Sequence, residues 1–497
     1  MKSDTMSVED KVIESQDTGD VEDRIEDIEP GTLKDQHDPL VWSTSRKLTI
    51  MLIVGIWILL GTTNMIIIGP ALQIIPEEFD SSFASSTYLI GGPLLAYGVA
   101  SFFWVPLANR YGVRLIFVVT AIAAGCMNCW AAKATSFGAL VAARTLASAF
   151  YAPPETLAPQ LIGDVFYLKD RAKAMTWVGI LQASGFTGGP LIGSYIIENE
   201  SLGWRWVEWV LAIVTFATAI GLLVLFPETQ YTGPTDHVTT RSWKDDLRFW
   251  PASGGGKPKD HSVVHGFKTI FPYFAHPIVM LNMVFFSLCL VVNSYLLTTQ
   301  SLTYLIVYHF GIGASGLTFL APCIGTWLAM LFCGILADRL FLRGVRKGDP
   351  RPKPERRLPL LLVTGAIGVA GCLIFGICTQ EHTHWIGPLF GSAFVSFSFI
   401  CSLSISFAYL LDIYEARMDM VMVIYNGMKN LAAFGISYAI VPWNESAGYT
   451  IPFAVMAVVL FVAHLPMLLL YIKGEKIRQW SVRKYKTAET SHHGDNF

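Results

Sequence analysis

LTIMLIVGIWILLGTTNMIIIGP, residues 48–70, is an apolar run without a charged side chain. A helix of about 20 such residues, at a rise of about 1.5 Å each, is long enough to cross the hydrocarbon core of a bilayer. Eleven more apolar runs of similar length follow, with polar segments between them, at residues 88–107, 113–132, 137–162, 175–197, 206–226, 278–297, 317–336, 358–378, 386–410, 421–441 and 451–472. The sequence therefore predicts an all-α membrane protein with twelve transmembrane helices.

The composition agrees with a membrane protein and argues against several soluble domains. Hydrophobic residues make up 53% of the 497 positions, charged residues 15%, and the mean hydropathy is +0.46. All eight cysteines fall within predicted spans, where they suit small buried apolar positions. The spacing of Cys126 and Cys129 resembles half of a zinc site, but no second pair or nearby His completes it. We therefore expect neither a metal site nor a cofactor.

The distribution of positive charge predicts which helix ends face the cytosol. With both termini in the cytosol, nearly all of the 36 Lys and Arg residues lie in the tails and loops of the cytosolic side. The outer side keeps only Lys133 and Arg205, and Arg144 and Lys429 lie within spans. This asymmetry follows the positive-inside rule, so we expect a multi-pass protein with two cytosolic tails.

The helices divide into two groups of six around a longer polar segment. We expect an acidic, disordered cytosolic tail, a first bundle, a cytosolic linker, a second bundle and a basic cytosolic tail, at residues 1–47, 48–229, 230–276, 277–472 and 473–497. The linker contains Gly256-Lys257, but Pro258 stands where a phosphate-binding loop needs Ser or Thr, which disfavours ATP-driven transport. LANRYGVR after helix two is echoed by GILADR after helix eight, as expected of two pseudo-symmetric halves.

Four short motifs stand at the borders of the predicted helices. They are DPLVWSTSRK at 38–47, GWRW at 203–206, PET at 227–229 and KPERRL at 353–358. They resemble the major facilitator superfamily, and within it the fungal drug:proton antiporter branch, and the resemblance extends over nearly the whole chain from Asp38 onward. It implies two six-helix bundles around a central cavity, in a secondary transporter that works by alternating access.

The loop after helix two resembles the superfamily's G-x-L-A-D-R-x-G-R-K motif. It keeps Arg110, Gly112 and Arg114, but Asn109 replaces the acidic residue. The resemblance implies that this loop helps to hold one conformation of the carrier, with Asp338 and Arg339 supplying the charged part of that contact in the second half. Helix dipoles and anionic lipid also favour cations at a cytosolic helix end, which is a simpler explanation of the motif.

Helix five contains GFTGGPLIGS at 185–194, which resembles the antiporter motif G-x-x-x-G-P-x-x-G-G in all but its last glycine. Gly185, Gly189 and Gly193 recur at four-residue spacing and so lie along one helix face, where they permit close approach of another backbone. Pro190 supplies no helical N–H and bends the segment. The motif predicts either an antiporter-type conformational element or ordinary packing of small residues.

Helix four carries two charged residues that we expect to share one cavity. On a continuous helix Glu155 lies about 20° around from Arg144 and about 16 Å along the axis, at 100° and 1.5 Å per residue. A charged side chain within a bilayer normally faces the bundle interior and has a partner. The resemblance implies a role for Arg144 in handling substrate or protons, and the competing interpretation is an arginine that only braces helices.

Helix eleven carries a polar stripe on an otherwise apolar segment, formed by Asn426, Lys429 and Asn430. We expect Lys429 to face the cavity, with interhelical hydrogen bonding as the alternative. Other polar residues within spans could line the same cavity, although each alone is explained by a hydrogen bond between helices; they are Asn64, Tyr97, Gln182, Asn282, Asn293 and Tyr295.

The sequence thus predicts a proton-coupled exporter of a small organic molecule, drug-like or a secondary metabolite, in the plasma membrane. Its expected partners are substrate, protons and lipid, with no nucleic acid, and we expect a monomer. It is not expected to be an enzyme, because His-Glu-x-x-His, Gly-x-Ser-x-Gly and dinucleotide fingerprints are missing from the sequence. The alternatives are uptake of a polyamine, another organic cation or a nutrient, and a non-transporting sensor. Two sequons, Asn199 and Asn444, lie in predicted outer loops as candidate glycosylation sites.

Overall fold

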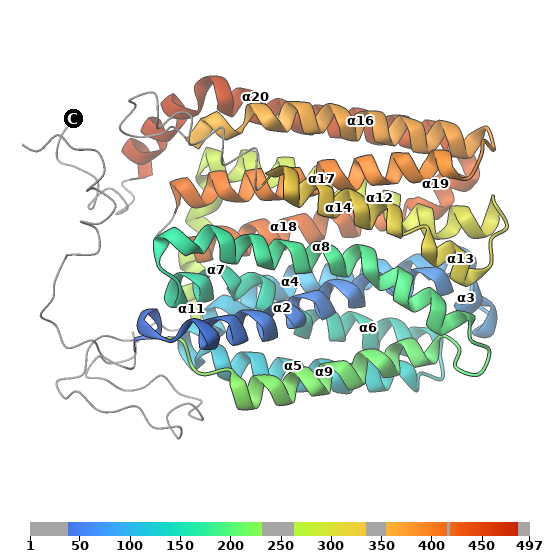
Figure 1. Ribbon diagram of the computed structural model, residues 1–497, viewed down its shortest axis with the longest axis horizontal. Coiled ribbons are helices and arrows are strands. Elements are labelled where there is room, and N and C mark those ends of the chain that lie inside the picture. The colour runs from blue at the N-terminus through green and yellow to red at the C-terminus, as the bar shows by residue number, and fades with distance from the viewer. Residues whose placement is uncertain (1–37, 231–262, 334–353, 415–417, 486–497) are drawn as a thin grey trace, which may run out of the picture.

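The computed structural model describes residues 38–230, 263–333, 354–414 and 418–485, and these are helical with short connections (Figure 1). The first half consists of α2 (Thr44–Ile66), α4 (Tyr88–Tyr111), α5 (Val113–Ala132), α6 (Phe137–Tyr151) followed by α7 (Pro153–Val165), α8 (Leu168–Glu198) and α9 (Arg205–Leu225). The second half consists of α12 (Pro277–Ile306), α13 (Ile312–Leu317) followed by α14 (Leu320–Phe332), α16 (Pro359–Gln380), α17 (Ile386–Ile413), α18 (Met418–Ser437) and α20 (Thr450–Tyr485).

The predicted all-α membrane fold is confirmed. Nine helical segments among the described residues are long and apolar enough to cross a bilayer. The combined α6–α7 segment, α8 and α18 complete the twelve crossings. The first is interrupted before Pro153, α8 begins with several charged residues and contains Pro190, and α18 contains Lys429.

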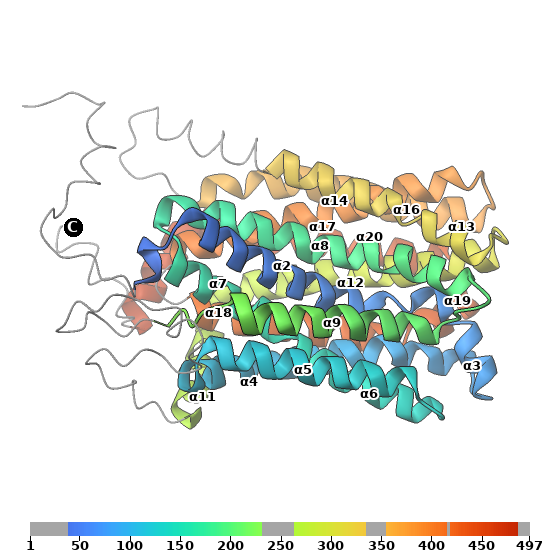
Figure 2. The same ribbon diagram turned by 60° about the horizontal axis from the view of Figure 1, so that its bottom comes forward.

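The helices run roughly parallel to one long axis, so that the bundle has two ends (Figures 1 and 2). We call the end at which α2 begins and α20 finishes the tail face; α7 and α11 (Val263–Ile270) also lie there. We call the opposite end the far face. It carries the short elements that connect the helices, η2 (Gly69–Ala71), α3 (Ile74–Glu78), η3 (Phe83–Thr87), α13 and α19 (Ile440–Ala447).

Several helix boundaries differ from those predicted. α12 extends to Ile306 and α20 to Tyr485, well beyond the apolar runs, so residues 473–485 of the predicted tail are helical. The part of the predicted linker that the structure describes contains α11 and η4 (Phe271–Ala275), and Phe267 of α11 packs edge-on against Phe103 of α4 at 5.1 Å. Two further short helices, η1 (Pro39–Val41) and η6 (Pro354–Arg357), lead into α2 and α16.

The largest difference lies in helix four, which is two helices. α6 ends at Tyr151 and α7 begins at Pro153, with Ala152 as the cap between them. Pro153 and Pro154 have no N–H to donate to α6, and the first turn of a helix is where proline is tolerated, so the pair of prolines begins a new helix. Ala152 itself has helical backbone angles, φ −70° and ψ −30°, so the interruption lies in the backbone hydrogen bonds that the two prolines cannot make.

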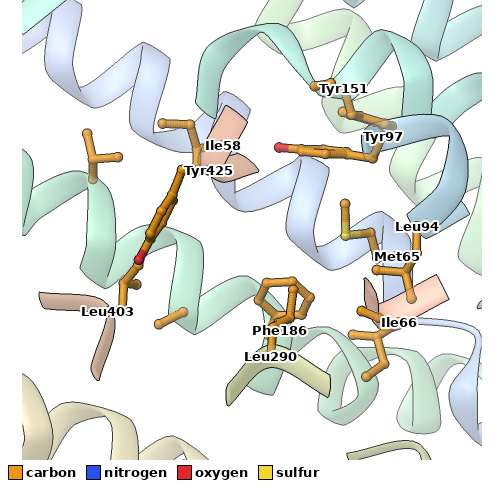
Figure 3. Close-up of a cluster of buried hydrophobic side chains, with 14 of the residues drawn as sticks. Ile58, Met65, Ile66, Leu94, Tyr97, Tyr151, Phe186, Leu290, Leu403 and Tyr425 are labelled. Atoms are coloured by element: carbon orange, nitrogen blue, oxygen red, sulfur yellow. The ribbon is translucent and has the colours of Figure 1, made fainter. Parts of the chain in front are cut away.

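The two bundles meet along α4 and α18 and along α8 with α13 and α14. At the first seam, a Cβ on Gly98 would lie 2.9 Å from the carbonyl oxygen of Gly427, so the backbones are in close contact. At the far-face end of the second seam, Glu198 of α8 accepts a hydrogen bond from the backbone N–H of Gly313 at 3.2 Å. Figure 3 shows part of the apolar core, with Tyr97 and Tyr425 supplied by opposite halves of the chain.

Candidate functional site

A cavity of about 180 Å³ lies between the bundles in the half of the molecule nearer the tail face. Its lining comes from α7 and α8 of the first half and from α14, α17 and α18 of the second, together with Arg357 of η6. Lys173, near the start of α8, and Arg357 lie toward the tail face, and Gln182 is about 14 Å farther along α8 at 1.5 Å per residue. The cavity therefore extends inward from the tail-face end.

The deep end of this cavity holds a buried ion pair that joins the two bundles. The ammonium of Lys429 on α18 donates to Oε1 of Glu155 on α7, and the two side chains are 4% and 5% exposed. Tyr97 of α4 donates its hydroxyl to Oε2 of the carboxylate at 2.6 Å, and Gln182 of α8 donates its amide to Oε1 at 2.7 Å. Four helices thus converge on one carboxylate.

The break between α6 and α7 positions this carboxylate. Glu155 lies in the first turn of α7, where a negative charge interacts favourably with the N-terminal end of the helix dipole. From the other bundle, the side-chain amide of Asn426 approaches the backbone carbonyl of Glu155 at 3.5 Å, and that of Asn430 donates to the carbonyl of Asn426 at 2.8 Å. The polar stripe of helix eleven therefore faces the interior, and Asn426 and Lys429 line the cavity.

Arg144 belongs to a second buried ion pair, which lies within the first bundle. Its guanidinium pairs with Glu208 of α9 and donates to the carbonyl oxygens of Asn64 at 2.5 Å and Leu89 at 3.4 Å. Arg144 and Glu208 are both fully buried and are not among the residues that line the cavity. The expectation that Arg144 and Glu155 share a cavity is wrong, because only Glu155 lines the cavity and the Arg144 guanidinium is held within the first bundle by Glu208.

Glu208 is the buried partner of Arg144 that sequence reasoning missed. It is the acidic residue within the predicted span 206–226, and a charged residue inside a span normally has a partner, so its presence there was an available signal. Asn64 belongs to the same network, since its amide donates to Ser148 at 2.8 Å. Tyr151 forms a separate buried cluster, in which its hydroxyl accepts from Asn128 at 2.7 Å and lies 2.5 Å from the hydroxyl of Thr215.

The other polar candidates of the second bundle bridge helices and do not line the cavity. Asn282 accepts from Ser406 at 2.8 Å and Asn293 accepts from Ser396 at 3.4 Å, each across α12 and α17. Tyr295 donates to Asn444 at 2.5 Å. Asn444 lies in the short connecting helix α19 of the far face and is half-buried, whereas Asn199 is exposed between α8 and α9.

The glycine motif of α8 packs against α2. A Cβ on Gly185 would lie 2.6 Å from the carbonyl oxygen of Leu59, and one on Gly189 would lie 3.3 Å from that of Thr63. A Cβ on Gly193 would collide with the carbonyl oxygen of Ile67. Pro190 lies within the same helix. The motif therefore allows two backbones of the first bundle to lie in close contact, away from the cavity.

The loop between α4 and α5 is held by an acidic residue from a distant motif. Gly112 has a φ of +93°, a conformation that favours glycine. Glu228 accepts hydrogen bonds from the backbone N–H groups of Val113 at 3.3 Å and Arg114 at 3.1 Å, and so caps the start of α5. Burial raises the pKa of Glu228, although the four backbone N–H groups that it accepts from oppose this shift.

The remaining residues of the loop motif have local partners. Asn109 accepts from the amide of Gln160 on α7 at 3.0 Å, and the buried guanidinium of Arg114 donates to the carbonyl of Leu223 on α9 at 2.6 Å. Arg110 is exposed and lies near the ring of Tyr111. Asp338 and Arg339 lie outside the residues that the structure describes.

Comparison with known proteins gives one family and many fungal relatives. A family model described as "Major Facilitator Superfamily" matches residues 54–437. The chain is 29% identical over 392 residues to "MFS transporter cpaT" of Aspergillus oryzae, covering 76% of this chain and 77% of that protein. It is 24% identical over 430 residues to "Efflux pump vrtL" of Penicillium aethiopicum, covering 84% and 83%.

A solved structure of similar fold is the xylose transporter XylE from E. coli in a partially occluded inward open conformation. It has a TM-score of 0.62 and 16% sequence identity, and the match covers 86% of this chain and 98% of that one. At this identity the likeness concerns the fold.

Proposed function

Because the chain belongs to the major facilitator superfamily and is therefore a multi-pass membrane transporter, we propose that it exports a small organic molecule in exchange for protons by alternating access. The observation that carries the proposal is the buried Glu155–Lys429 ion pair, which joins α7 to α18 at the deep end of the cavity. Export is supported by relatives that include efflux pumps, and a secondary metabolite or drug-like compound is the proposed cargo.

The ion pair is placed where protonation would change the contact between the bundles. Removing one charge of a buried pair leaves the other charge without compensation, at a cost of about 3–5 kcal/mol. Protonation of the Glu155 carboxylate would therefore weaken the link between α7 and α18 and favour a rearrangement of the two bundles. Since the pair lines the cavity, the bound substrate and the proton act on the same contact.

The direction of loading follows from the orientation that the positive charges predict. If the tail face is cytosolic, the cavity extends inward from the cytosolic end, and the far face is closed by contacts such as that between Glu198 and Gly313. Substrate would enter from the cytosol, and the segments 48–229 and 277–472 would rock to open the far face. The plasma membrane is the proposed location.

Accumulation of a labelled panel of organic compounds tests this function, in cells with and without the protein and at two external pH values. Export predicts that removal of the protein raises the intracellular level of one or more compounds, and more so when the outside is acidic. Uptake predicts that removal lowers it, and a sensor predicts no flux.

Proteoliposomes then test the coupling group. We expect Glu155→Gln to abolish transport driven by a pH gradient. A Glu155→Gln protein that keeps full pH-driven transport would eliminate this carboxylate as the coupling acid.

A further inference from the structure

The groups around the buried ion pair match those that bind an organic ammonium ion. The Glu155 carboxylate keeps two donors other than Lys429, the hydroxyl of Tyr97 and the amide of Gln182, so it stays oriented if the lysine leaves. The Lys429 ammonium also lies over the Phe286 ring, 5.5 Å from its centre. A carboxylate together with an aromatic face is a favourable environment for a cation.

The aromatic face is part of a stack. Phe286 of α12 lies parallel to Tyr425 of α18, with ring centroids 4.7 Å apart and an angle of 8°, and Tyr425 lines the cavity. The stack fixes the ring that faces the ammonium. A cation that replaced Lys429 at the carboxylate would meet the same ring.

An unpaired acceptor belongs to Asn426, whose amide approaches the backbone carbonyl of Glu155. The side-chain oxygen of Asn426 is buried, belongs to a residue that lines the cavity, and has no hydrogen-bond partner among the described residues. Buried polar atoms are normally hydrogen-bonded, so this oxygen is complementary to a ligand that carries an N–H or O–H donor. Together with the carboxylate it favours a donor-rich cation over an anion.

The cations near the cavity entrance are balanced locally. Lys173 is 3.5 Å from Asp170, and Arg357 is 3.4 Å from Asp412. Lys429 is the cation at the deep end among the described lining residues, and its partner is Glu155. The other titratable groups that face the pair or line the cavity are the hydroxyls of Tyr97 and Tyr425 and the thiol of Cys333.

We infer that the Lys429 ammonium occupies the position of the substrate's own ammonium group, so that the transported molecule is an apolar amine in its protonated form. This inference rests on the proposed function and specifies its substrate class. Most of the cavity wall is apolar and includes three flexible methionine side chains, Met175, Met330 and Met422, which adapt to ligands of different shape.

For an amine substrate the same geometry assigns the exchanged proton to Lys429, while Glu155 stays ionised as the counter-ion of the bound ammonium. Glu155→Gln then abolishes coupled transport because it removes that counter-ion. When the substrate ammonium pairs with Glu155, the lysine loses its counter-ion in surroundings that are too apolar for an unpaired charge. Lys429 then releases one proton to the water of the cavity. One ammonium ion enters and one proton leaves, so the charge of the site is unchanged. After the bundles rock, Lys429 takes a proton from the other side and displaces the amine.

Proton release on binding measures this exchange directly. The full chain is placed in lipid nanodiscs in weakly buffered solution at neutral pH with a pH-sensitive dye, and labelled 2-phenylethylamine is added. We expect one proton to be released for each amine bound. An exposed lysine of α20 gives the control variant, Lys476→Met, which should behave as the wild type.

Two substitutions of the lysine make opposite predictions. Lys429→Met removes the tethered competitor, so the amine should still bind, and Glu155, which takes up a proton when it has no counter-ion, releases that proton as the ammonium arrives. Lys429→Arg keeps the ion pair and therefore the fold, but an arginine cannot give up its proton. We expect Lys429→Arg to bind the amine at least tenfold more weakly.

Wild-type binding of the amine by Lys429→Arg would overturn the inference, even if Lys429→Met did not fold. Absence of amine binding to the wild type, or binding of 3-phenylpropionate in its place, would refute the substrate class. If only this inference fails, wild-type proteoliposomes still transport other compounds when a pH gradient is applied. If the proposed function fails, wild-type proteoliposomes show no pH-driven transport of any compound.

Discussion

Replacing Glu208 with Leu separates the two interpretations of Arg144. In the wild type both side chains are fully buried, and the guanidinium also donates to the carbonyls of Asn64 and Leu89. The single substitution leaves a buried guanidinium without its carboxylate, at an expected cost of about 3–5 kcal/mol in the free energy of unfolding.

A second substitution should recover much of this loss. In Arg144→Met/Glu208→Leu no charge is left unpaired, and the remaining defect is the loss of donors to two backbone carbonyls. At about 1 kcal/mol for each hydrogen bond, the double variant should be about 2 kcal/mol less stable than the wild type, and so more stable than Glu208→Leu alone. Thermal unfolding of the purified proteins in detergent, followed by size-exclusion chromatography after heating, measures the order.

Transport by the double variant then decides the role of the arginine. If Arg144 only braces helices of the first bundle, proteoliposomes with the folded double variant keep pH-driven transport. If it handles substrate or protons, they lose it. A single variant as stable as the wild type, or a double variant no more stable than the single, would refute the assignment of the pair as an electrostatic unit.

Three further outcomes follow from the structure. Gly193→Ala should lower thermal stability and transport, because its Cβ would collide with a carbonyl of the chain after α2, while Gly188→Ala, with open space at that position, should be nearly neutral in the same assays. Asn444→Gln should leave the electrophoretic mobility of the protein expressed in a glycosylating host unchanged, because this asparagine lies within a helix and is bonded to Tyr295. Partial burial raises the pKa of Glu78, but hydrogen bonds from a tryptophan and an arginine lower it overall. The ionised carboxylate therefore contributes its full stabilisation of the fold above the usual pKa of a glutamate, and this stabilisation is lost as the pH falls through the lowered pKa. Glu78→Gln should reduce the free energy of unfolding by about 0.5 kcal/mol at neutral pH and by less in acid, as measured by thermal unfolding across pH.

The helices could be predicted from the sequence because each crossing is a local property. An apolar run of sufficient length must satisfy its backbone hydrogen bonds internally within lipid, and the runs correspond to observed helices from α2 to α20. The positions of the glycines at 185–193 also predicted a close helix contact, and the structure identifies its partner as α2.

The pairing of the buried charges could not be predicted in the same way. Two successive prolines interrupt the helix between Arg144 and Glu155, and helical periodicity alone does not say which buried residue each charge meets. Glu208 is 64 residues from Arg144 in the sequence, and Lys429 is 274 residues from Glu155. Which charges become partners therefore depends on how the helices pack. The polar stripe of helix eleven was informative because its direction follows from local periodicity alone.

The two buried ion pairs differ in the feature that matters for a carrier, which is whether they cross the boundary between the bundles. Arg144 and Glu208 both belong to the first bundle, so their pair remains intact if the two bundles move as units. Glu155 and Lys429 belong to different bundles and face the cavity, so movement of the bundles or arrival of a charged ligand must alter their contact. A group can couple substrate to protons only if both change its free energy. This requirement favours the pair between α7 and α18 as the coupling site and the pair between α6 and α9 as a brace.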